Sequence, residues 1–282
     1  MNAPVSRPSS QASPAGGAPP AALPIEQAIG LQRWFDAYVD RFRQPSGGLE
    51  PMLELKYFHC GRVAAVAEGI AADLGWPADE VRLARTVGLL HDVGRFSQFR
   101  QFGTYHDPVS VDHGQRGCEV LAAERALDGC PAGLARLIRG TVRLHNARAL
   151  PPSLRPAAGR FVRLVRDADK IDALRIFDEA IETGTLRDNP EICWNMPRHG
   201  PLSPRLLEDV GQGRIGSYAE VRSVDDFQLV LLSWAFDLQF GPSRRRARVA
   251  GYFDRMVGRL PDGPLVRRIA SHVFQALEGD PG

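Results

Sequence analysis

Apolar residues recur every three or four positions along most of the chain after residue 24, which is the spacing of one buried helical face. Five apolar residues of the run IEQAIGLQRWFDAYVDRF share one stripe: Ile25, Ile29, Phe35, Val39 and Phe42. The pattern predicts helices at about 25–42, 53–74, 77–93, 113–127, 131–146 and 159–183. Gly75 and Gly94 are expected to end the second and third of them. No alternating run is long enough to predict a sheet, so the expected fold class is all-α.

The amino-acid composition of the chain changes at two places. Residues 1–24 are rich in Pro, Ala, Ser and Gly and lack a continuous apolar centre, which predicts a disordered tail and not a secretory signal. After the predicted core at 25–183, the segment TLRDNPEICWNMPRHGPLSP is full of turn formers, and the run SVDDFQLVLLSWAFDLQF predicts a buried helix with a Ser or Asp cap. Residues 184–282 are therefore expected to form a loop and C-terminal helices packed on the core. A separate C-terminal subdomain is the alternative.

Composition and charge exclude several classes of protein. With 282 residues, 44% hydrophobic and 24% charged, the chain can bury a sizeable core. A formal net charge of +2 gives no overall attraction to nucleic acid or to a membrane surface, and the basic run SRRRARVAGYFDRMVGRL fits a solvated helix face or the lip of an anion site. The longest apolar run, FQLVLLSWAF, is about half of a membrane span. Four scattered cysteines without a CxxC suit a reducing compartment, so a cytoplasmic protein is expected.

Several polar residues lie on the apolar stripes of different predicted helices. They are His59, His91, His145 and Asp169, and Asp92 adjoins His91. Burying a polar group without a partner costs a few kcal/mol, and a carboxylate costs more. A hydrogen-bonded core histidine is the ordinary explanation for any one of them. Because a shared cation would satisfy all of them together, the whole set favours a metal site.

Three motifs carry these residues in the order H…HD…D: FHCGRV with His59, LLHDVGRF with His91 and Asp92, and RDADKID with Asp169. Over roughly residues 50–180 they resemble the signature of the HD-domain metal-dependent phosphohydrolase superfamily. The resemblance implies an HD-domain helical bundle with a C-terminal helical extension, in which these four residues bind a metal ion.

Two more histidines extend the resemblance. His113, in VDHGQRG, and His145, in VRLHNAR, lie between the doublet and Asp169, where superfamily members with two metals carry further ligands. The expectation is a dinuclear site bridged by Asp92. In the alternative with one metal, His113 supports other groups or starts a helix, and His145 donates a proton to the substrate.

The ligand types suggest a mechanism without naming an element. Imidazole and carboxylate ligands suit Mn, Fe, Co, Ni, Zn or Mg, so one or two divalent ions are expected. Such an ion lowers the pKa of bound water from about 15.7 to roughly 7, which predicts in-line attack on phosphorus by metal-bound hydroxide. Asp92, Arg95, Lys170 and His145 would take part in catalysis. In the family, basic residues at the positions of Arg95 and Lys170 commonly contact phosphate or the site carboxylates. Arg62 would help to bind substrate unless it pairs with Asp167 or another carboxylate.

The predicted function is hydrolysis of a phosphate ester or anhydride of a small molecule, with a nucleotide as the favoured substrate. One alternative is a diiron oxygenase, because some HD-fold proteins with two extra histidines activate oxygen. The other is a regulatory module that binds a nucleotide without cleaving it.

A few features are expected to lie outside this centre. The run GQGRIG at 211–216 follows no predicted strand, so it does not predict a dinucleotide site. The run FSQFRQFGTYHDP, which contains His106, is expected to be a loop, and His199 and His272 are expected on the surface. Asp237 could pair with an arginine or support a metal ligand.

Overall fold

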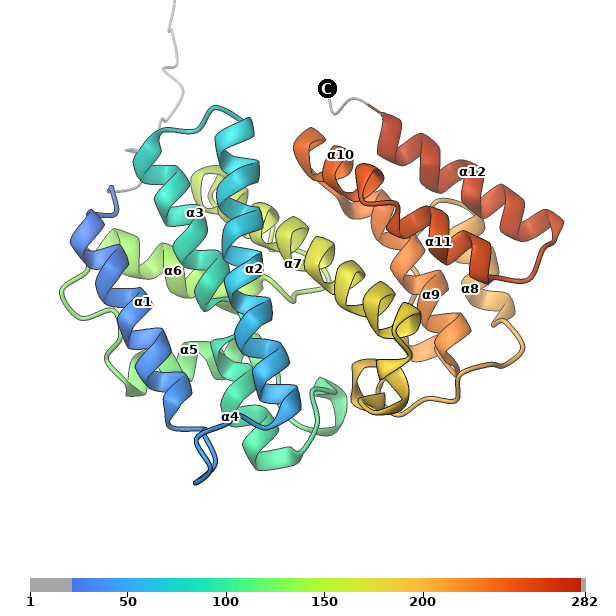
Figure 1. Cartoon of the computed structure of the whole chain (residues 1–282). Coiled ribbons are helices and arrows are strands. Elements are labelled where there is room, and N and C mark those ends of the chain that lie inside the picture. Colours follow the sequence, from blue (N-terminus) through green and yellow to red (C-terminus); the bar gives the residue numbers. More distant parts are fainter. Residues whose placement is uncertain (1–21, 280–282) are drawn as a thin grey trace, which may run out of the picture.

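The computed structural model describes residues 22–279, and residues 1–21 of the predicted tail lie outside them. Within that span the chain forms helices and no strand, which confirms the all-α prediction (Figure 1). Helices occur over each predicted range. The first seven are α1 (Ile25–Asp40), α2 (Pro51–Asp73), α3 (Ala78–Leu90), α4 (Val93–Phe102), α5 (His113–Ala123), α6 (Ala132–Leu144) and α7 (Pro156–Glu182).

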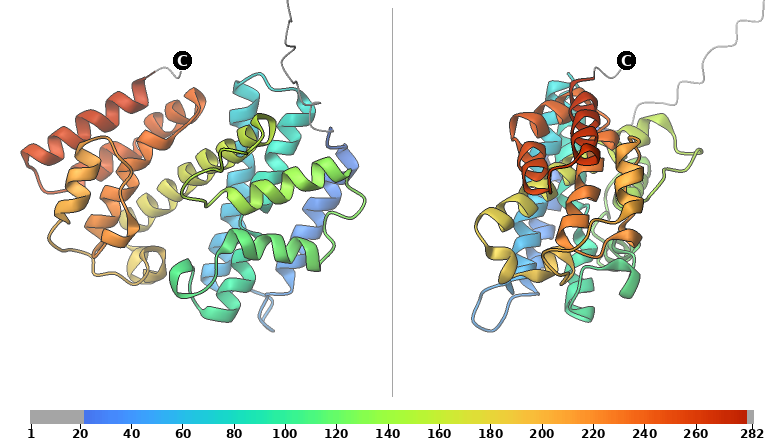
Figure 2. Two further views of the ribbon diagram at one scale, coloured as in Figure 1. Left: turned by 180° about the vertical axis from the view of Figure 1, so that it is seen from behind. Right: turned by 90° about the vertical axis from the view of Figure 1, so that its right-hand side faces the viewer.

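Helix α2 lies at the centre of this bundle, packed against α3 and α7. Helix α1 packs on α3, and α5 lies between α4 and α6. The left view of Figure 2, seen from behind, has α5 and α6 in front of α2 and α3. The buried face of α1 differs from the predicted stripe at its start. Ile25 and Ile29 are 55% and 47% exposed, whereas Leu31 and Tyr38 are buried together with Phe35. The bundle therefore covers only the second half of the predicted stripe.

Gly94 does not end a helix, contrary to the prediction. Helix α3 ends at Leu90 and α4 begins at Val93, so that most of the run FSQFRQFGTYHDP, expected to be a loop, is helical. A Cβ atom on Gly94 would meet the carbonyl oxygen of His113 and lie 2.5 Å from the amide nitrogen of Gly117. The missing side chain thus lets α4 cross α5 in backbone contact. The helix ends instead at Gly103, whose φ is 67°.

The C-terminal section begins with 3-10 turns at Thr185–Arg187 (η2) and Pro190–Cys193 (η3). It continues with α8 (Pro204–Gly211), a turn at Tyr218–Glu220 (η4), α9 (Val224–Ser233), a turn at Trp234–Asp237 (η5), α10 (Gly241–Val249), α11 (Tyr252–Arg259) and α12 (Pro264–Glu278). Helix α8 begins at the end of the turn-rich segment 185–204, in a stretch where no helix was predicted. The Ser223 hydroxyl accepts from the Asp226 amide, so the start of α9 is capped as predicted.

The C-terminal section packs mainly on α7. Helices α10 and α11 both contact α7, and Phe177 on α7 stacks on Phe227 on α9 with ring centroids 5.7 Å apart. In Figure 1 this section lies on the right, and α7 runs from the bundle into it. Across residues 22–279, none of the helices combines the length and the apolar character needed to cross a bilayer.

Candidate metal centre

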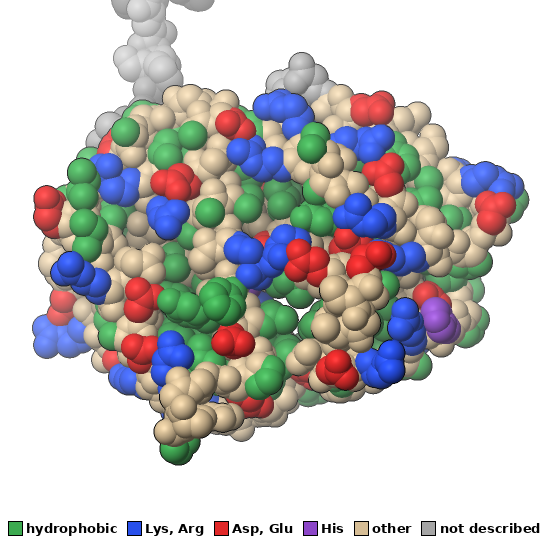
Figure 3. Space-filling model, viewed as in Figure 1, with side chains coloured by type: hydrophobic (Ala, Val, Ile, Leu, Met, Phe, Trp, Pro, Cys, Tyr) green, Lys and Arg blue, Asp and Glu red, His purple; other side chains and the backbone are tan. Residues whose placement is uncertain are grey.

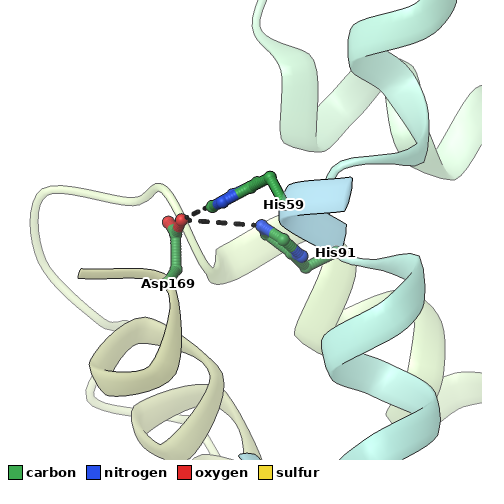
Figure 4. Close-up of side chains that lie close together, drawn as sticks. All are labelled: His59, His91 and Asp169. Atoms are coloured by element: carbon green, nitrogen blue, oxygen red, sulfur yellow. Dashed lines mark ion pairs between the residues drawn. The ribbon is translucent and has the colours of Figure 1, made fainter. Parts of the chain in front are cut away.

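His59, His91 and Asp169 point toward one another from α2, from the junction of α3 and α4, and from α7 (Figure 4). The Asp169 Oδ1 atom lies 3.1 Å from Nε2 of His59 and 3.6 Å from Nε2 of His91. Both imidazoles are buried, while the Asp169 side chain is 31% exposed. The centre is therefore enclosed by the bundle and reached from the side of Asp169.

Asp92 extends this group toward the two further histidines. Its Oδ2 atom lies 3.5 Å from Nε2 of His59 and 3.6 Å from Nε2 of His91. Its Oδ1 atom lies 3.5 Å from Nε2 of His113 and 3.4 Å from Nε2 of His145. The carboxylate thus has one oxygen toward each pair of imidazoles, and the structure brings together all six residues predicted as ligands.

Each of the four imidazoles has its Nδ1 atom next to an oxygen that can only accept a hydrogen bond. These contacts are His59 to Asp172 at 2.7 Å, His91 to the Gly88 carbonyl at 2.7 Å, His113 to Asp107 at 2.6 Å, and His145 to the Val142 carbonyl at 2.8 Å. Nδ1 must therefore carry a proton in every ring. In the neutral imidazole, Nε2 then presents its lone pair to the centre, as a metal ligand does.

The Nε2 atoms have no ordinary partner for these lone pairs. Those of His59 and His91 are buried without a hydrogen bond, which costs about 1–3 kcal/mol for each. Those of His113 and His145 lie 3.0 Å apart, so two acceptors face each other unless a cation or a proton lies between them. Single ligand atoms of His59, His91 and Asp169, and of His91, Asp92 and His145, lie within 4.8 Å of one another. These nitrogen and oxygen ligands fit a divalent cation.

The charges in the centre also suit a cation. Burial opposes the charge of Asp92, but Lys56 and His91 hold its pKa well below its usual range. Burial, together with Arg95, lowers the pKa of His113 to about 4, so this ring is neutral at neutral pH. Burial and Lys56 lower the pKa of His59, yet Asp169 and Asp172 outweigh them and its pKa is raised. A cation would therefore compete with a proton at His59.

Arg62 and Arg95, two of the basic residues expected to bind phosphate, are paired with carboxylates. The Arg62 Nε atom donates to Asp172 Oδ1 at 2.7 Å, so the carboxylate alternative holds, with Asp172 in place of Asp167. Arg95 donates through Nη1 to Asp107 Oδ1 at 2.8 Å, and its Nε atom is buried without a partner, 3.6 Å from Asp92 Oδ1. Both arginines thus hold the acids that orient His59 and His113.

Lys170 is held in the same way. Its Nζ atom donates to Asp237 Oδ2 at 2.5 Å, and Arg166 Nη2 donates to the same oxygen at 3.1 Å. Arg166 Nη1 also donates to the carbonyl of His145 at 3.2 Å. Asp237 is therefore the partner of both Lys170 and Arg166, and Arg166 links it to the backbone of His145.

Lys56 belongs to the centre, although the sequence analysis missed it. Its Nζ atom donates to Asp92 Oδ2 at 2.8 Å, its side chain is 15% exposed, and it lies over the Tyr105 ring, 5.4 Å from the centroid. Its position could have been predicted from the sequence, because Lys56 precedes His59 by three residues and therefore lies on the same face of α2. Asp172, three residues after Asp169, offered the same signal. Asp107 offered none, because it reaches His113 from the short 3-10 turn η1 (Asp107–Val109), which the sequence did not predict.

The remaining histidines lie away from the six ligands. His106 is in the loop after α4, but its ring stacks on Trp194. His199 is 77% exposed, as predicted, and His272 is half-buried on α12. Gly211 and Gly216 flank the loop after α8, and no strand precedes them within residues 22–279. The four cysteines are free.

A comparison with protein families agrees with this geometry. Residues 57–174 match the family model described as HD domain. No curated protein and no solved structure matches the chain. The matched span runs from α2 into α7 and contains the six residues that meet at the centre. HD domains are typical of metal-dependent hydrolases, and the histidine and aspartate cluster is compatible with metal binding. The chain therefore contains an HD domain, as the three motifs predicted.

Proposed function

We propose that this protein is a divalent-metal-dependent phosphohydrolase of a small phosphorylated molecule, with a nucleotide as the favoured substrate. The observation that carries the proposal is the position of Asp92 within an HD domain. One of its oxygens faces Nε2 of His59 and His91, and the other faces Nε2 of His113 and His145. This arrangement fits a carboxylate that bridges two cations.

In this proposal, His59, His91 and Asp169 would hold one ion, His113 and His145 would hold the second, and Asp92 would offer an oxygen to each. A divalent cation supplies a Lewis acid there and lowers the pKa of a water molecule on it. The contacts at Nδ1 fix the four rings before any ion arrives, because each ring already donates to an oxygen. Burial of the rings excludes bulk water and strengthens every charge interaction inside the centre.

Lys56 is the best candidate to contact the phosphoryl group. Arg62 and Lys170 are paired with Asp172 and Asp237, which are not among the six candidate ligands, whereas Lys56 is paired with Asp92, which is one of them. The ammonium of Lys56 has three donors, of which Asp92 takes one. The buried Nε atom of Arg95 lies near the other Asp92 oxygen without a partner. Fixed positive charge at these two places stabilises the charge that develops on phosphoryl oxygens.

Aromatic rings near the centre support a nucleotide as substrate. Trp194 and Tyr218 lie edge to face with ring centroids 5.1 Å apart, and Tyr218 remains 39% exposed. The Trp194 ring also stacks on His106, the residue before Asp107, and Asp107 accepts from His113 of the centre. Exposed aromatic surface beside the centre suits a planar base.

The test combines metal analysis with an assay of phosphate release. The substrates are nucleoside mono-, di- and triphosphates, dinucleoside polyphosphates and cyclic nucleotides, each with a series of divalent metals. The double variant His91→Ala/Asp92→Ala is expected to lose metal and activity together, whereas His199→Ala, at an exposed position, should keep both. Full activity in the double variant would contradict the site.

The diiron oxygenase is a second candidate, because the two additional histidines do lie in the centre, with their Nε2 atoms 3.0 Å apart. It predicts iron in the purified protein and turnover that stops without oxygen. Phosphate release under strictly anaerobic conditions, with a metal other than iron, would exclude it. If the protein is a module that only binds a nucleotide, the bound nucleotide should be recovered intact with every metal tested.

A further inference from the structure

The loop Thr104–Asp107 connects the candidate metal centre to the C-terminal section. On the side of the centre, Asp107 Oδ2 accepts from His113 Nδ1 at 2.6 Å, and Asp107 Oδ1 accepts from Arg95 at 2.8 Å and from Gln98 at 2.9 Å. The orientation of the His113 ring therefore depends on where this loop places Asp107.

On its other side, the loop is held by η3 of the C-terminal section. Glu191 Oε1 accepts from the backbone amide of Tyr105 at 2.9 Å and from the Thr104 hydroxyl. The His106 ring stacks on Trp194, with centroids 4.5 Å apart and planes 12° apart. Figure 1 shows the loop after α4 facing the turns that follow α7, and Figure 3 shows an opening through the molecule between the two groups of helices.

Trp194 itself is fixed by a strained turn. Trp194 and Asn195 have φ values of 50° and 59°, a region that residues other than glycine seldom adopt. The Asn195 amide donates to the Pro190 carbonyl at 2.9 Å, and its side chain donates to Glu191 Oε2 at 2.8 Å. The Trp194 ring also lies edge to face with Phe227 at 5.3 Å. Strain of this kind persists only where the surroundings hold it in place.

We propose that Glu191 and Trp194 are positioning residues for the second cation of the HD centre. They hold the loop Thr104–Asp107, and Asp107 in turn orients His113. This inference rests on the proposed function. The first group of ligands does not depend on the loop, because the ring of His59 is oriented by Asp172 on α7 and that of His91 by a carbonyl of α3. Loss of the contact should therefore weaken one cation selectively.

The experiment is a calorimetric titration of the full-length protein, stripped of metal, with Co²⁺. The wild type is expected to bind two equivalents. Glu191→Ala and Trp194→Leu should weaken the second equivalent about tenfold or more, the range seen when support for a metal ligand is removed, and leave the first unchanged. Trp194→Phe keeps a ring for stacking and Glu191→Gln keeps the Oε1 acceptor, so both should retain wild-type affinity.

A reference variant and a control distinguish a positioning role of Glu191 and Trp194 from a general loss of protein stability. His113→Ala should lose the second equivalent, and adding Trp194→Leu to it should change nothing further. Glu182→Ala removes a carboxylate that pairs with Arg259 and should leave both affinities unchanged. Wild-type affinities in Glu191→Ala and Trp194→Leu would overturn the proposal, as would equal weakening of both equivalents. If the wild type binds only one Co²⁺, the positioning role is overturned, but a hydrolase with one metal ion remains possible. If the wild type binds no Co²⁺, the proposed function is overturned as well.

Discussion

The orientation of the His59 ring depends on a carboxylate that is itself held by two arginines. Asp172 accepts from His59 Nδ1 at 2.7 Å, from Arg62 Nε at 2.7 Å and from Arg175 Nε at 3.0 Å. Asp172→Ala is expected to lower the affinity for divalent metal about 10- to 100-fold, because outer partners of metal ligands typically contribute that much. Competition with a chelator would measure the affinity.

A second buried aspartate on α7 is the matched control for Asp172. Asp178 also pairs with two arginines, Arg255 at 2.6 Å and Arg259 at 2.7 Å, but within residues 22–279 it pairs with none of the six candidate ligands. Asp178→Ala should lower the stability of the protein and leave its metal affinity unchanged. Equal losses of affinity in the two variants would mean that Asp172 acts only through the stability of α7.

Lys56 provides a separate test at the scale of single residues. Lys56→Met removes the ammonium next to Asp92 and keeps most of the apolar stem. The rate of phosphate release should fall about 100-fold, the loss typical for one fixed donor in an active site, while metal content stays at the wild-type level. Lys56→Arg should recover part of the rate. If metal is lost with activity, Lys56 supports Asp92 and does not bind substrate.

Helical periodicity could predict that His59, His91, His145 and Asp169 turn inward, with Asp92 beside His91, because these four lie on apolar stripes. His113 was expected only from the resemblance. The sequence could not fix the partners of Arg62, since a long guanidinium side chain reaches more than one carboxylate. Lys56 was not predicted to lie in the centre for a related reason. A lysine near the start of a helix usually extends to solvent, and only the position of Asp92 at the next helix junction turns it inward.

At the scale of the helices, the junction of α3 and α4 places the His91–Asp92 doublet. Local rules treat a glycine after an apolar helix as a stop, and on that basis Gly94 was expected to end the third helix. In the structure, Gly94 instead lets α4 approach the backbone of α5 closely. That role depends on a contact with residues 113–117, which no local pattern contains. For the same reason, α4 was missed.

Gly94→Ala tests this contact between α4 and α5. The added Cβ atom would meet the backbone of His113 and Gly117, which cannot move aside as a side chain can. A loss of about 1–3 kcal/mol in the free energy of unfolding is expected, as for overpacked cores, and should be measurable by urea denaturation. Gly140→Ala on α6, with nothing within 4 Å, should instead be neutral or stabilise by about 0.5–1 kcal/mol. Equal stabilities would contradict the proposed role of Gly94.

At the scale of the whole molecule, α7 joins the two groups of helices. Its first half carries Asp169 into the centre, and its second half packs Phe177 on Phe227 of the C-terminal section. The run that forms α9 was predictable as a buried helix because it is nearly all apolar. Its contact with α7, and that of η3 with the loop after α4, join residues far apart in sequence, and periodicity carries no information on such pairs.

Because the six candidate ligands come from five regions of the bundle, a bound cation should stabilise the protein as a whole. A ligand that binds only the folded state adds about 2.7 kcal/mol at 100 times its dissociation constant. Added Mn²⁺ should therefore raise the melting temperature in a concentration-dependent way, and a chelator should reverse the shift. The His91→Ala/Asp92→Ala variant should melt at one temperature in both conditions. A shift of the same size in that variant would place the ion elsewhere on the protein and remove the basis for a hydrolytic centre.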